Sequence, residues 1–436
     1  MPPGIPYIIA NELAERFSYY GMNSILVIFM TRHLLDANGA PDHMTPAQAN
    51  VWYHSFVFWL YGVAALGAIV SDALLGKYRT ILYLSIVYCF GHLALALDDT
   101  RTGLLAGLSL IVIGAGGIKP CVSANVGDQF GPANQHLLPR AFSWFYFSVN
   151  LGSIFATLLI PELLDRYGPR VAFGTPGIFM LLATLIFWLG RRRYVHVPPA
   201  GTGFLREAMS KEGLKALGNL ALLVPFIAMF WAIWQQNFSS WVLQAEKMDR
   251  QFLGHEWLSA QIQTVNALFI LLLIPLFSYA VYPAVNRFFT LTPLRKITIG
   301  MFLGVLAFLI PAWIESRIGQ GLKPHIGWQV LAYIILTAAE VMVAVPHLEF
   351  SYTHAPQRLK SLVMSLYLGS MALGNKFTER VNAHIQNPDG TTKLSGPDYF
   401  LFFSGVLFVT AILFIFVAWA YRGKTYTTHP QSTQAA

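Results

Sequence analysis

The sequence predicts an all-α integral membrane protein with twelve transmembrane helices in two six-helix bundles. Of its 436 residues, 55% are hydrophobic and 11% are charged, and the mean hydropathy is +0.52. Apolar runs of about 20 residues, the length that crosses a bilayer, recur between short polar or Pro/Gly-rich breaks. A longer polar stretch near the middle divides these runs into two sets of six, as in transporters built from two similar halves.

In chain order, the runs predict helices near residues 6–31, 49–70, 79–97, 103–124, 141–162, 171–190, 219–241, 260–284, 295–315, 327–348, 359–385 and 398–421. We therefore expect four regions. They are an N-terminal six-helix bundle over 1–190, a cytoplasmic linker over 191–218 with an amphipathic stretch at 204–217, a C-terminal six-helix bundle over 219–421, and a disordered tail over 422–436.

The basic residues indicate topology rather than nucleic-acid binding. The formal net charge is +8, but Lys and Arg lie in small clusters between the apolar runs instead of on one basic face. An even number of helices puts both termini on one side, and the clusters at 77–79, 191–193 and 295–296 favour the cytoplasm for that side.

The cysteines and the N-terminal segment give two further expectations. The two cysteines, Cys89 and Cys121, lie within apolar segments, so no disulfide framework is expected. The first helix lacks a basic leader, so we expect it to be retained in the mature protein.

The first helix carries charges where lipid would otherwise be expected. Glu12, Glu15 and Arg16 are spaced so that they share one face, and an ionised side chain in hydrocarbon costs about 3 kcal/mol or more. Two carboxylates sharing one arginine can act as a proton switch, in which protonation of one frees Arg16 for another anion. Snorkelling toward the cytoplasmic surface is the alternative. The same face continues through Tyr19, Tyr20 and Asn23.

Two further charges are isolated in apolar runs of opposite halves. Lys119 follows a glycine-rich stretch and could hold a carboxylate, whereas Glu340 has no basic residue in its own turn and could hold an amine. A structural interhelical ion pair is the alternative for each.

Uncharged polar residues give weaker signals. His54 is a candidate proton acceptor, because the reference pKa of histidine lies near neutrality, but a structural, hydrogen-bonded histidine is equally compatible. Aromatic and amide side chains could line a pocket, although in such bundles they more often pack or anchor at interfaces. These are Tyr53, Tyr61, Asn150, Trp231, Asn266 and Tyr367.

Several ordered motifs resemble those of the proton-dependent oligopeptide transporters, a branch of the major facilitator superfamily. The stretch from Glu12 to Gly21 resembles the family's first-helix motif, and Gly67–Lys77 resembles its loop motif after the second span. Similar matches occur at 116–123, 145–152, 230–232, 243–245 and 348–356. Together they cover nearly the whole chain.

The resemblance implies a proton-coupled symporter that imports di- and tripeptides by alternating access within the major facilitator fold. Lys119 and Arg16 would lie near the peptide carboxylate, and Glu340 near its amine. Glu12, Glu15 and Arg16 would couple protons to transport, and His54 is similar to a histidine that animal members use in proton handling. The implied pocket residues are Tyr19, Tyr20, Tyr61, Asn150, Trp231 and Asn266, to which Tyr367 is added as a candidate.

The sequence also departs from the family pattern. Many members have an arginine where Asn23 stands and an acidic residue where Gln235 stands, and that pair closes the outer gate. We expect Asn23 and Gln235 to approach each other as a neutral substitute. The large outer domain of animal members and the two extra helices of many bacterial members are absent. This indicates a minimal member in the plasma membrane, the bacterial inner membrane.

Three alternatives remain open. Another small solute such as nitrate is possible within the wider family. An intramembrane enzyme is disfavoured because no His-Glu-x-x-His, Gly-x-Ser-x-Gly or close histidine cluster occurs, and a passive channel would show no proton coupling. A nucleotide-binding loop is also missing. We therefore expect no cofactor, no metal and no obligate protein partner, with peptides, protons and the lipid bilayer as the partners.

Overall fold

Helices make up nearly all of the regular structure, because in a membrane every backbone N–H and C=O must be bonded within its own segment. The computed structural model describes residues 1–199, 201, 209–353, 360–387 and 391–421. The N-terminal segments are α1 (Ile5–Arg32), α2 (Pro46–Val70), η1 (Ser71–Leu75), α3 (Lys77–Leu97), α4 (Arg101–Ile111), η2 (Val112–Gly116), α5 (Gly117–Asp128), η3 (Gln135–Leu137), α6 (Leu138–Tyr167), α7 (Pro169–Leu189) and η4 (Gly190–Arg192).

The C-terminal segments follow the same pattern, with more interruptions. They are α9 (Lys211–Ala221), α10 (Val224–Trp234), η5 (Gln235–Phe238), α11 (Ser240–Ala245), β1 (Gln251–Phe252), β2 (His255–Glu256), η6 (Ser259–Gln263), α12 (Thr264–Leu276), η7 (Phe277–Val281), α13 (Tyr282–Asn286), α14 (Pro293–Gly319), α15 (Gly327–Thr353), α16 (Lys360–Ile385) and α17 (Pro397–Ala420).

The strands β1 and β2 form a small antiparallel hairpin in the polar loop after α11. The two residues between them, Leu253 and Gly254, have φ values of 56° and 77°. Positive φ at both central residues is what a tight two-residue turn needs. The hairpin is thus a local addition to an otherwise helical chain.

The helices match the expected membrane spans. Among the described residues, ten helical segments are long and apolar enough to cross a membrane. α1 and α16 have the length as well, with 28 and 26 residues, but their charged and polar side chains lower the hydropathy. With these two helices, all twelve expected spans are helical.

Several helix starts follow from local chemistry. The Thr45 hydroxyl accepts a hydrogen bond from the Gln48 backbone N–H, and the Gln48 side chain accepts one from the Thr45 backbone N–H. Pro46 then occupies the first turn of α2, where its missing N–H is not needed. Thr100 and Thr292 cap α4 and α14 by accepting a backbone N–H in the same way.

The fourth span packs unusually closely on α2. A Cβ atom on Gly116 would lie 2.5 Å from the Leu60 carbonyl oxygen, and a Cβ atom on Gly67 would collide with Gly117. Small residues allow such backbone contact between membrane helices. The π-helical turn η2 ends at Gly116, one of the contacting residues, so the glycines fix the position at which α5 presents Lys119.

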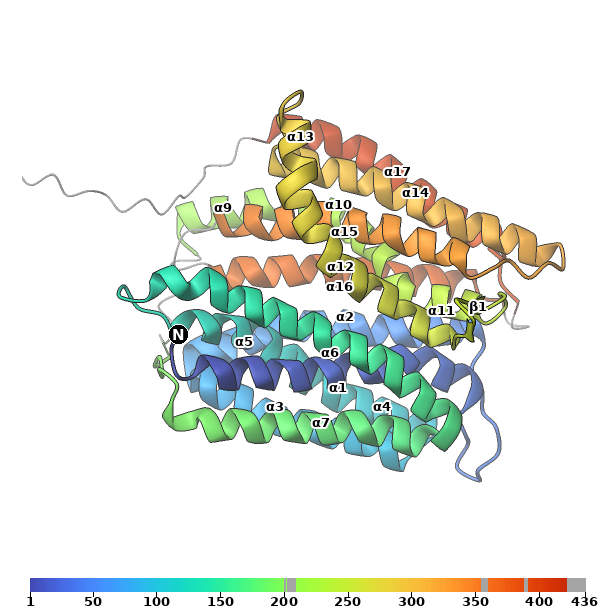
Figure 1. Ribbon diagram of the computed structural model, residues 1–436, viewed down its shortest axis with the longest axis horizontal. Helices are drawn as coiled ribbons and strands as arrows, with labels where there is room; N and C mark the ends of the chain where they lie inside the picture. Colours follow the sequence, from blue (N-terminus) through green and yellow to red (C-terminus); the bar gives the residue numbers. More distant parts are fainter. Residues whose placement is uncertain (200, 202–208, 354–359, 388–390, 422–436) are drawn as a thin grey trace, which may run out of the picture.

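The helices pack in two sets that meet along α2 and α16. In the N-terminal set, α1 packs on α6 and α7, and α3 packs on α4 and α7; in the C-terminal set, α14 packs on α15 and α17. α2 contacts α16 extensively across the two sets (Figure 1). We call the end that carries the α1–α2 loop the outer end; it lies opposite the N-terminus in Figure 1.

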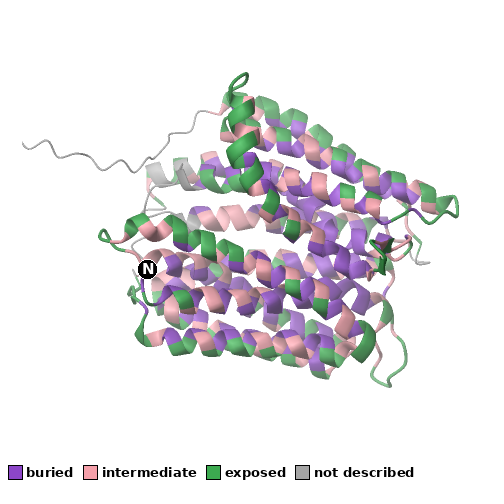
Figure 2. Ribbon diagram, in the orientation of Figure 1, coloured by how far each residue is buried: buried purple, intermediate pink, exposed green. Residues whose placement is uncertain are grey.

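Large apolar side chains are exposed on the outside of the helix assembly. Trp59, Leu66, Leu181 and Phe416 are 55, 60, 52 and 64% exposed, whereas polar residues such as Ser18 and Asn375 are fully buried. Figure 2 shows exposed residues along the outward faces of the helices and buried ones toward the centre. This distribution is expected for a protein whose outer surface faces lipid.

The first part of the expected linker docks on the inner end of the N-terminal set. The Gln129 side chain accepts a hydrogen bond from the Val195 N–H at 2.9 Å, and the His196 ring packs edge-on against Tyr78. Of the expected amphipathic stretch, residues 204–208 lie outside the described residues, and α9 runs from Lys211 to Ala221 across the expected boundary at 218. The tail 422–436 also lies outside the described residues.

Candidate substrate and proton site

The charged cluster of α1 lies inside the helix assembly. The Nε atom of Arg16 lies 2.6 Å from Glu12 Oε1 and 3.1 Å from Glu15 Oε2. The two carboxylates are 1% and 3% exposed, and Arg16 is 14% exposed. One arginine therefore bridges two buried carboxylates, an arrangement that snorkelling to the surface would not produce.

Lys119 lies close to α1 from the side of α5. Its ammonium nitrogen is 4.2 Å from the centroid of the Tyr19 ring and 5.6 Å from that of Tyr61. Within the described part of the chain Lys119 has no carboxylate at ion-pair distance. Aromatic faces thus hold this cation in place of a structural ion pair.

Glu340 is positioned by its neighbours in the C-terminal set. Its Oε2 atom accepts a hydrogen bond from the Asn266 amide at 2.8 Å, and the same amide lies 3.1 Å from the Thr337 hydroxyl. No Lys or Arg of the described residues pairs with Glu340. The carboxylate is therefore oriented by an amide and keeps the capacity to bind a cation.

Tyrosines lie between the charges of the two sets. Tyr20 and Tyr61 are each within electrostatic range of Arg16 in one set and Glu340 in the other, and Tyr367 is within range of Tyr61 and Glu340. All of these residues, Arg16 included, are half-buried, as Lys119 is. We call the group the central cluster; it comprises Arg16, Tyr20, Tyr61, Lys119, Asn266, Glu340 and Tyr367.

Two expected pocket residues, Trp231 and Asn150, are less available for contact with a substrate. Trp231 is 2% exposed, and its ring packs against Phe230 and Trp234. The Asn150 amide donates to the Tyr146 carbonyl oxygen of its own helix at 2.9 Å, which leaves its Oδ1 for other contacts. Among the described residues neither forms a hydrogen bond with Lys119 or Glu340.

At the expected outer gate, Asn23 and Gln235 share a tyrosine neighbour. The Gln235 amide donates to the Tyr53 hydroxyl at 2.9 Å, whereas neither amide atom of Asn23 has a hydrogen-bond partner among the described residues. Asn23 nevertheless lies within interaction range of the same hydroxyl. Both amides therefore lie near the Tyr53 hydroxyl, and their direct approach to each other stays a prediction.

His54 also joins the two sets. Its Nδ1 atom lies 2.7 Å from Asn375 Oδ1 and its Nε2 atom 3.1 Å from Ser239 Oγ, and the side chain is fully buried. Sequence reasoning identified His54 but missed both partners. Their signals were the polar run Gln235–Ser240 inside an apolar span and the polar face of α16 at Asn375, Thr378 and Asn382.

More hydrogen bonds close the outer end. Gln263 donates to the Ser24 carbonyl oxygen at 3.1 Å, Gln261 donates to the Leu158 carbonyl oxygen at 2.9 Å, and Arg32 forms an ion pair with Glu246. Each joins the N-terminal set to the C-terminal set. The outer end is thus closed above the half-buried central cluster.

The fold and the central cluster define a polytopic transporter of the major facilitator type. Residues 78–209 and 202–396 match the sequence pattern of the POT family, and the chain belongs to this family.

Solved structures and curated proteins agree with this assignment. A crystal structure of an auto-inhibited POT family peptide transporter has a TM-score of 0.88 and 33% identity, and the match covers 98% of this chain and 99% of that one. Peptide transporter family 1 of Drosophila melanogaster is 38% identical over 73% of this chain and 48% of the relative. Solute carrier family 15 member 2 of Homo sapiens is 33% identical over 79% and 53%. The chain spans about half the length of these curated relatives.

Proposed function

We propose that the protein is a proton-coupled symporter that imports di- and tripeptides by alternating access. The observation that carries the proposal is the pair of isolated charges, Lys119 and Glu340, in opposite helix sets with tyrosines between them. A zwitterionic peptide has one carboxylate and one amine held apart by its backbone. Such a ligand supplies the missing partner of each charge.

The contacts suggest a role for each residue of the cluster. Lys119 and Arg16 bind the peptide carboxylate, and Glu340, oriented by Asn266, binds the amine. Tyr19, Tyr20, Tyr61 and Tyr367 offer ring faces and hydroxyls to the peptide backbone. Side chains that vary between peptides would meet these rings and Trp231, which suits a transporter of many related substrates.

Protons supply the driving force. One positive charge that moves inward gains about 2.3 kcal/mol per 100 mV, and each pH unit adds about 1.4 kcal/mol. Protonation of Glu12 or Glu15 weakens its hold on Arg16, which then turns to the peptide carboxylate. His54 at the outer gate is the second proton site.

The two helix sets, residues 1–190 and 219–421, would rock about the central cluster to expose it to either side. Both termini lie in the cytoplasm, because the basic clusters fall on the side of the N-terminus. The twelve-helix architecture is consistent with the inner membrane of a bacterium.

Uptake of labelled dialanine into proteoliposomes tests the proposal. A valinomycin-induced, inside-negative potential at equal pH should drive accumulation, about fifty-fold at 100 mV for one proton. As a control, a proton ionophore should abolish the accumulation. Failure of dipeptides to compete with a labelled small anion that is taken up would favour nitrate-type transport. Unitary currents would favour a channel.

A further inference from the structure

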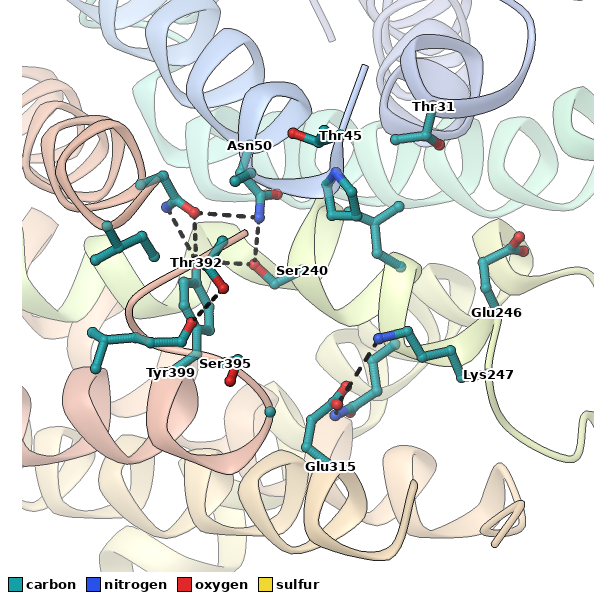
Figure 3. A pocket seen from close by; sticks show the side chains of 18 of the residues that line it. Thr31, Thr45, Asn50, Ser240, Glu246, Lys247, Glu315, Thr392, Ser395 and Tyr399 are labelled. Carbon is teal, nitrogen blue, oxygen red and sulfur yellow. Dashed lines mark hydrogen bonds and ion pairs between the residues drawn. The ribbon is translucent and has the colours of Figure 1, made fainter. Parts of the chain in front are cut away.

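A polar pocket of about 620 Å³ opens at the outer end, apart from the central cluster. It lies between the ends of α1 and α2 on one side and α11, α14, α16 and α17 on the other (Figure 3). We call it the outer vestibule. Its charged residues are Arg32, Glu246, Lys247 and Glu315.

Four buried polar residues form one wall of the vestibule. The Asn50 amide lies 3.3 Å from the Ser240 hydroxyl and 3.4 Å from Asn382 Oδ1. The Tyr399 hydroxyl lies 3.2 Å from Ser240 and 3.1 Å from the Asn382 amide. Figure 3 shows the hydrogen bond between Asn50 and Ser240 within this wall. The Asn50 Oδ1 atom is buried and accepts no hydrogen bond from the described residues.

His54 lies behind this wall, on the side away from the vestibule. On α2, Asn50 precedes His54 by one helical turn, and Ser240 directly follows Ser239, whose hydroxyl contacts the imidazole. The wall therefore separates the vestibule from His54 by the thickness of one turn, about 5.4 Å. A single water molecule that accepts or donates at Asn50 spans such a gap.

The hydrogen bonds assign the atom of His54 that can take a proton. The Asn375 amide nitrogen donates to the Met371 carbonyl oxygen at 2.9 Å, so its Oδ1 faces His54 and accepts from Nδ1–H. Neutral His54 then has an unprotonated Nε2, which accepts from the Ser239 hydroxyl. Nε2 is the nitrogen on the Ser239 side, next to the vestibule wall.

We propose that the outer vestibule is the path by which His54 is protonated from outside while the peptide gate is closed, with Asn50, Ser240 and Ser239 as its positioning residues. A hydronium ion in the vestibule gives a proton to the water molecule at Asn50, that water gives a proton to the Ser239 oxygen, and the Ser239 hydroxyl proton moves to Nε2. Hydronium becomes water and imidazole becomes imidazolium. The inference rests on the proposed proton coupling and adds the route and its residues.

The groups around His54 determine what protonation costs while the gate is closed. Tyr53 from α2, Asn375 from α16 and Ser239 are its neutral neighbours. The nearby charges of α16, Lys376 and Glu379, pair with each other at 2.7 Å. In the vestibule Arg32 pairs with Glu246, and Lys247 lies 4.0 Å from Glu315. Among the described residues an imidazolium at His54 therefore has no carboxylate partner. Protonation through the vestibule is unfavourable while the gate is closed, and it shifts the gate toward the open state, in which water stabilises the imidazolium.

Asn50→Leu tests the path, because leucine has a similar size and holds no water. In proteoliposomes, proton-driven dialanine uptake should fall about tenfold, while gradient-free exchange of peptide stays within about twofold. Asn50→Ser should restore uptake to within about threefold, because it keeps a polar group. Asn125→Leu removes another buried amide, at the inner end, and should leave both rates unchanged.

A spectroscopic measurement keeps the test independent of transport. With ¹⁵N-labelled histidine, the His54 signal, identified by its loss in His54→Gln, should follow a change in outer pH in the wild type and lag in Asn50→Leu. Equal protonation in both proteins, or Asn50→Ser as slow as Asn50→Leu, would overturn the path. If the signal follows outer pH but peptide uptake ignores the proton gradient, the path stands and the proposed coupling fails.

Discussion

At the scale of single residues, Glu340 is a carboxylate prepared for a cation that the protein itself does not supply. Asn266 fixes its orientation through one hydrogen bond, and its remaining acceptor capacity is unused by Lys or Arg of the described residues. Desolvated groups of this kind bind strongly when the opposite charge arrives. The amine terminus of the substrate should therefore depend on this one side chain.

Glu340→Gln should weaken dialanine binding about 10- to 100-fold, because a hydrogen bond to a charged group contributes about 1.5–3 kcal/mol. Binding to detergent-solubilised protein would measure the loss. N-acetyl-dialanine, which has no amine charge, should bind weakly to the wild type and equally weakly to the variant. A variant that still prefers the free amine over the acetylated peptide would remove Glu340 from this role.

Glu15→Gln should separate transport from coupling. Within the described part of the chain both oxygens of Glu15 lack hydrogen-bond donors, and the side chain is 3% exposed with Arg16 as its ion-pair partner. A neutral amide mimics the permanently protonated acid, so peptide exchange should persist while uphill accumulation is lost. Normal accumulation in this variant, at equal protein levels, would leave His54 as the better proton site.

The charged candidates could be read from the sequence because charge in an apolar run is costly in any fold. Their partners could not. Asn266 and Tyr19 become neighbours of Glu340 and Lys119 only through packing between helices distant in sequence. The approach of Asn23 to Gln235 stays a prediction, and nothing in the sequence shows that the Gln235 amide donates to the Tyr53 hydroxyl.

At the scale of elements, apolar length predicted the helices, and small residues decide how they pack. The span 103–124 was expected as one helix, and the structure divides it into α4, η2 and α5 with a π-helical turn. Hydropathy carries no signal for such a turn. The glycines do carry one, since Gly116 and Gly117 bring two backbones into contact.

Gly116→Ala should lower the thermal stability and reduce uptake, because its Cβ would lie 2.5 Å from the backbone oxygen of Leu60 and the helices must separate. Overpacking of this kind typically costs about 1–3 kcal/mol. Gly62→Ala, on α2, is the matched control: nothing lies within 4 Å of its added Cβ, and its stability should not fall. Equal melting temperatures for both variants in detergent would contradict the assignment.

At the scale of the whole molecule, the outer closure is distributed over many neutral hydrogen bonds and one exposed charge pair. Thr157 contacts Thr264 at 2.8 Å, Gln235 contacts Tyr53, and Arg32 pairs with Glu246 at the rim, with Arg32 59% exposed. Exposed ion pairs contribute about 0–1 kcal/mol, and neutral hydrogen bonds about 1 kcal/mol each. Closure should therefore change little with salt concentration.

Charges restored at the gate should strengthen closure. Asn23→Arg combined with Gln235→Glu should favour the outward-closed state, whereas either single change leaves one buried charge unpaired and should impair transport more than the double change. Distances between spin labels at the outer ends of α1 and α11, together with uptake rates, complete the double-mutant cycle. Additive effects of the two single changes would show that the positions do not interact.

The resting place of Lys119 bears on the half of the cycle in which nothing is carried. A symporter must return empty, and an ion pair between its halves would have to break on every return. Here Tyr19, on a helix of the same half, holds the ammonium against its ring at 4.2 Å. That contact is worth about 0.5–2 kcal/mol and moves with the half that contains it. The Tyr19 ring therefore takes the place of the substrate carboxylate beside Lys119 when no substrate is bound. The empty protein can then change conformation without breaking an ion pair between its halves.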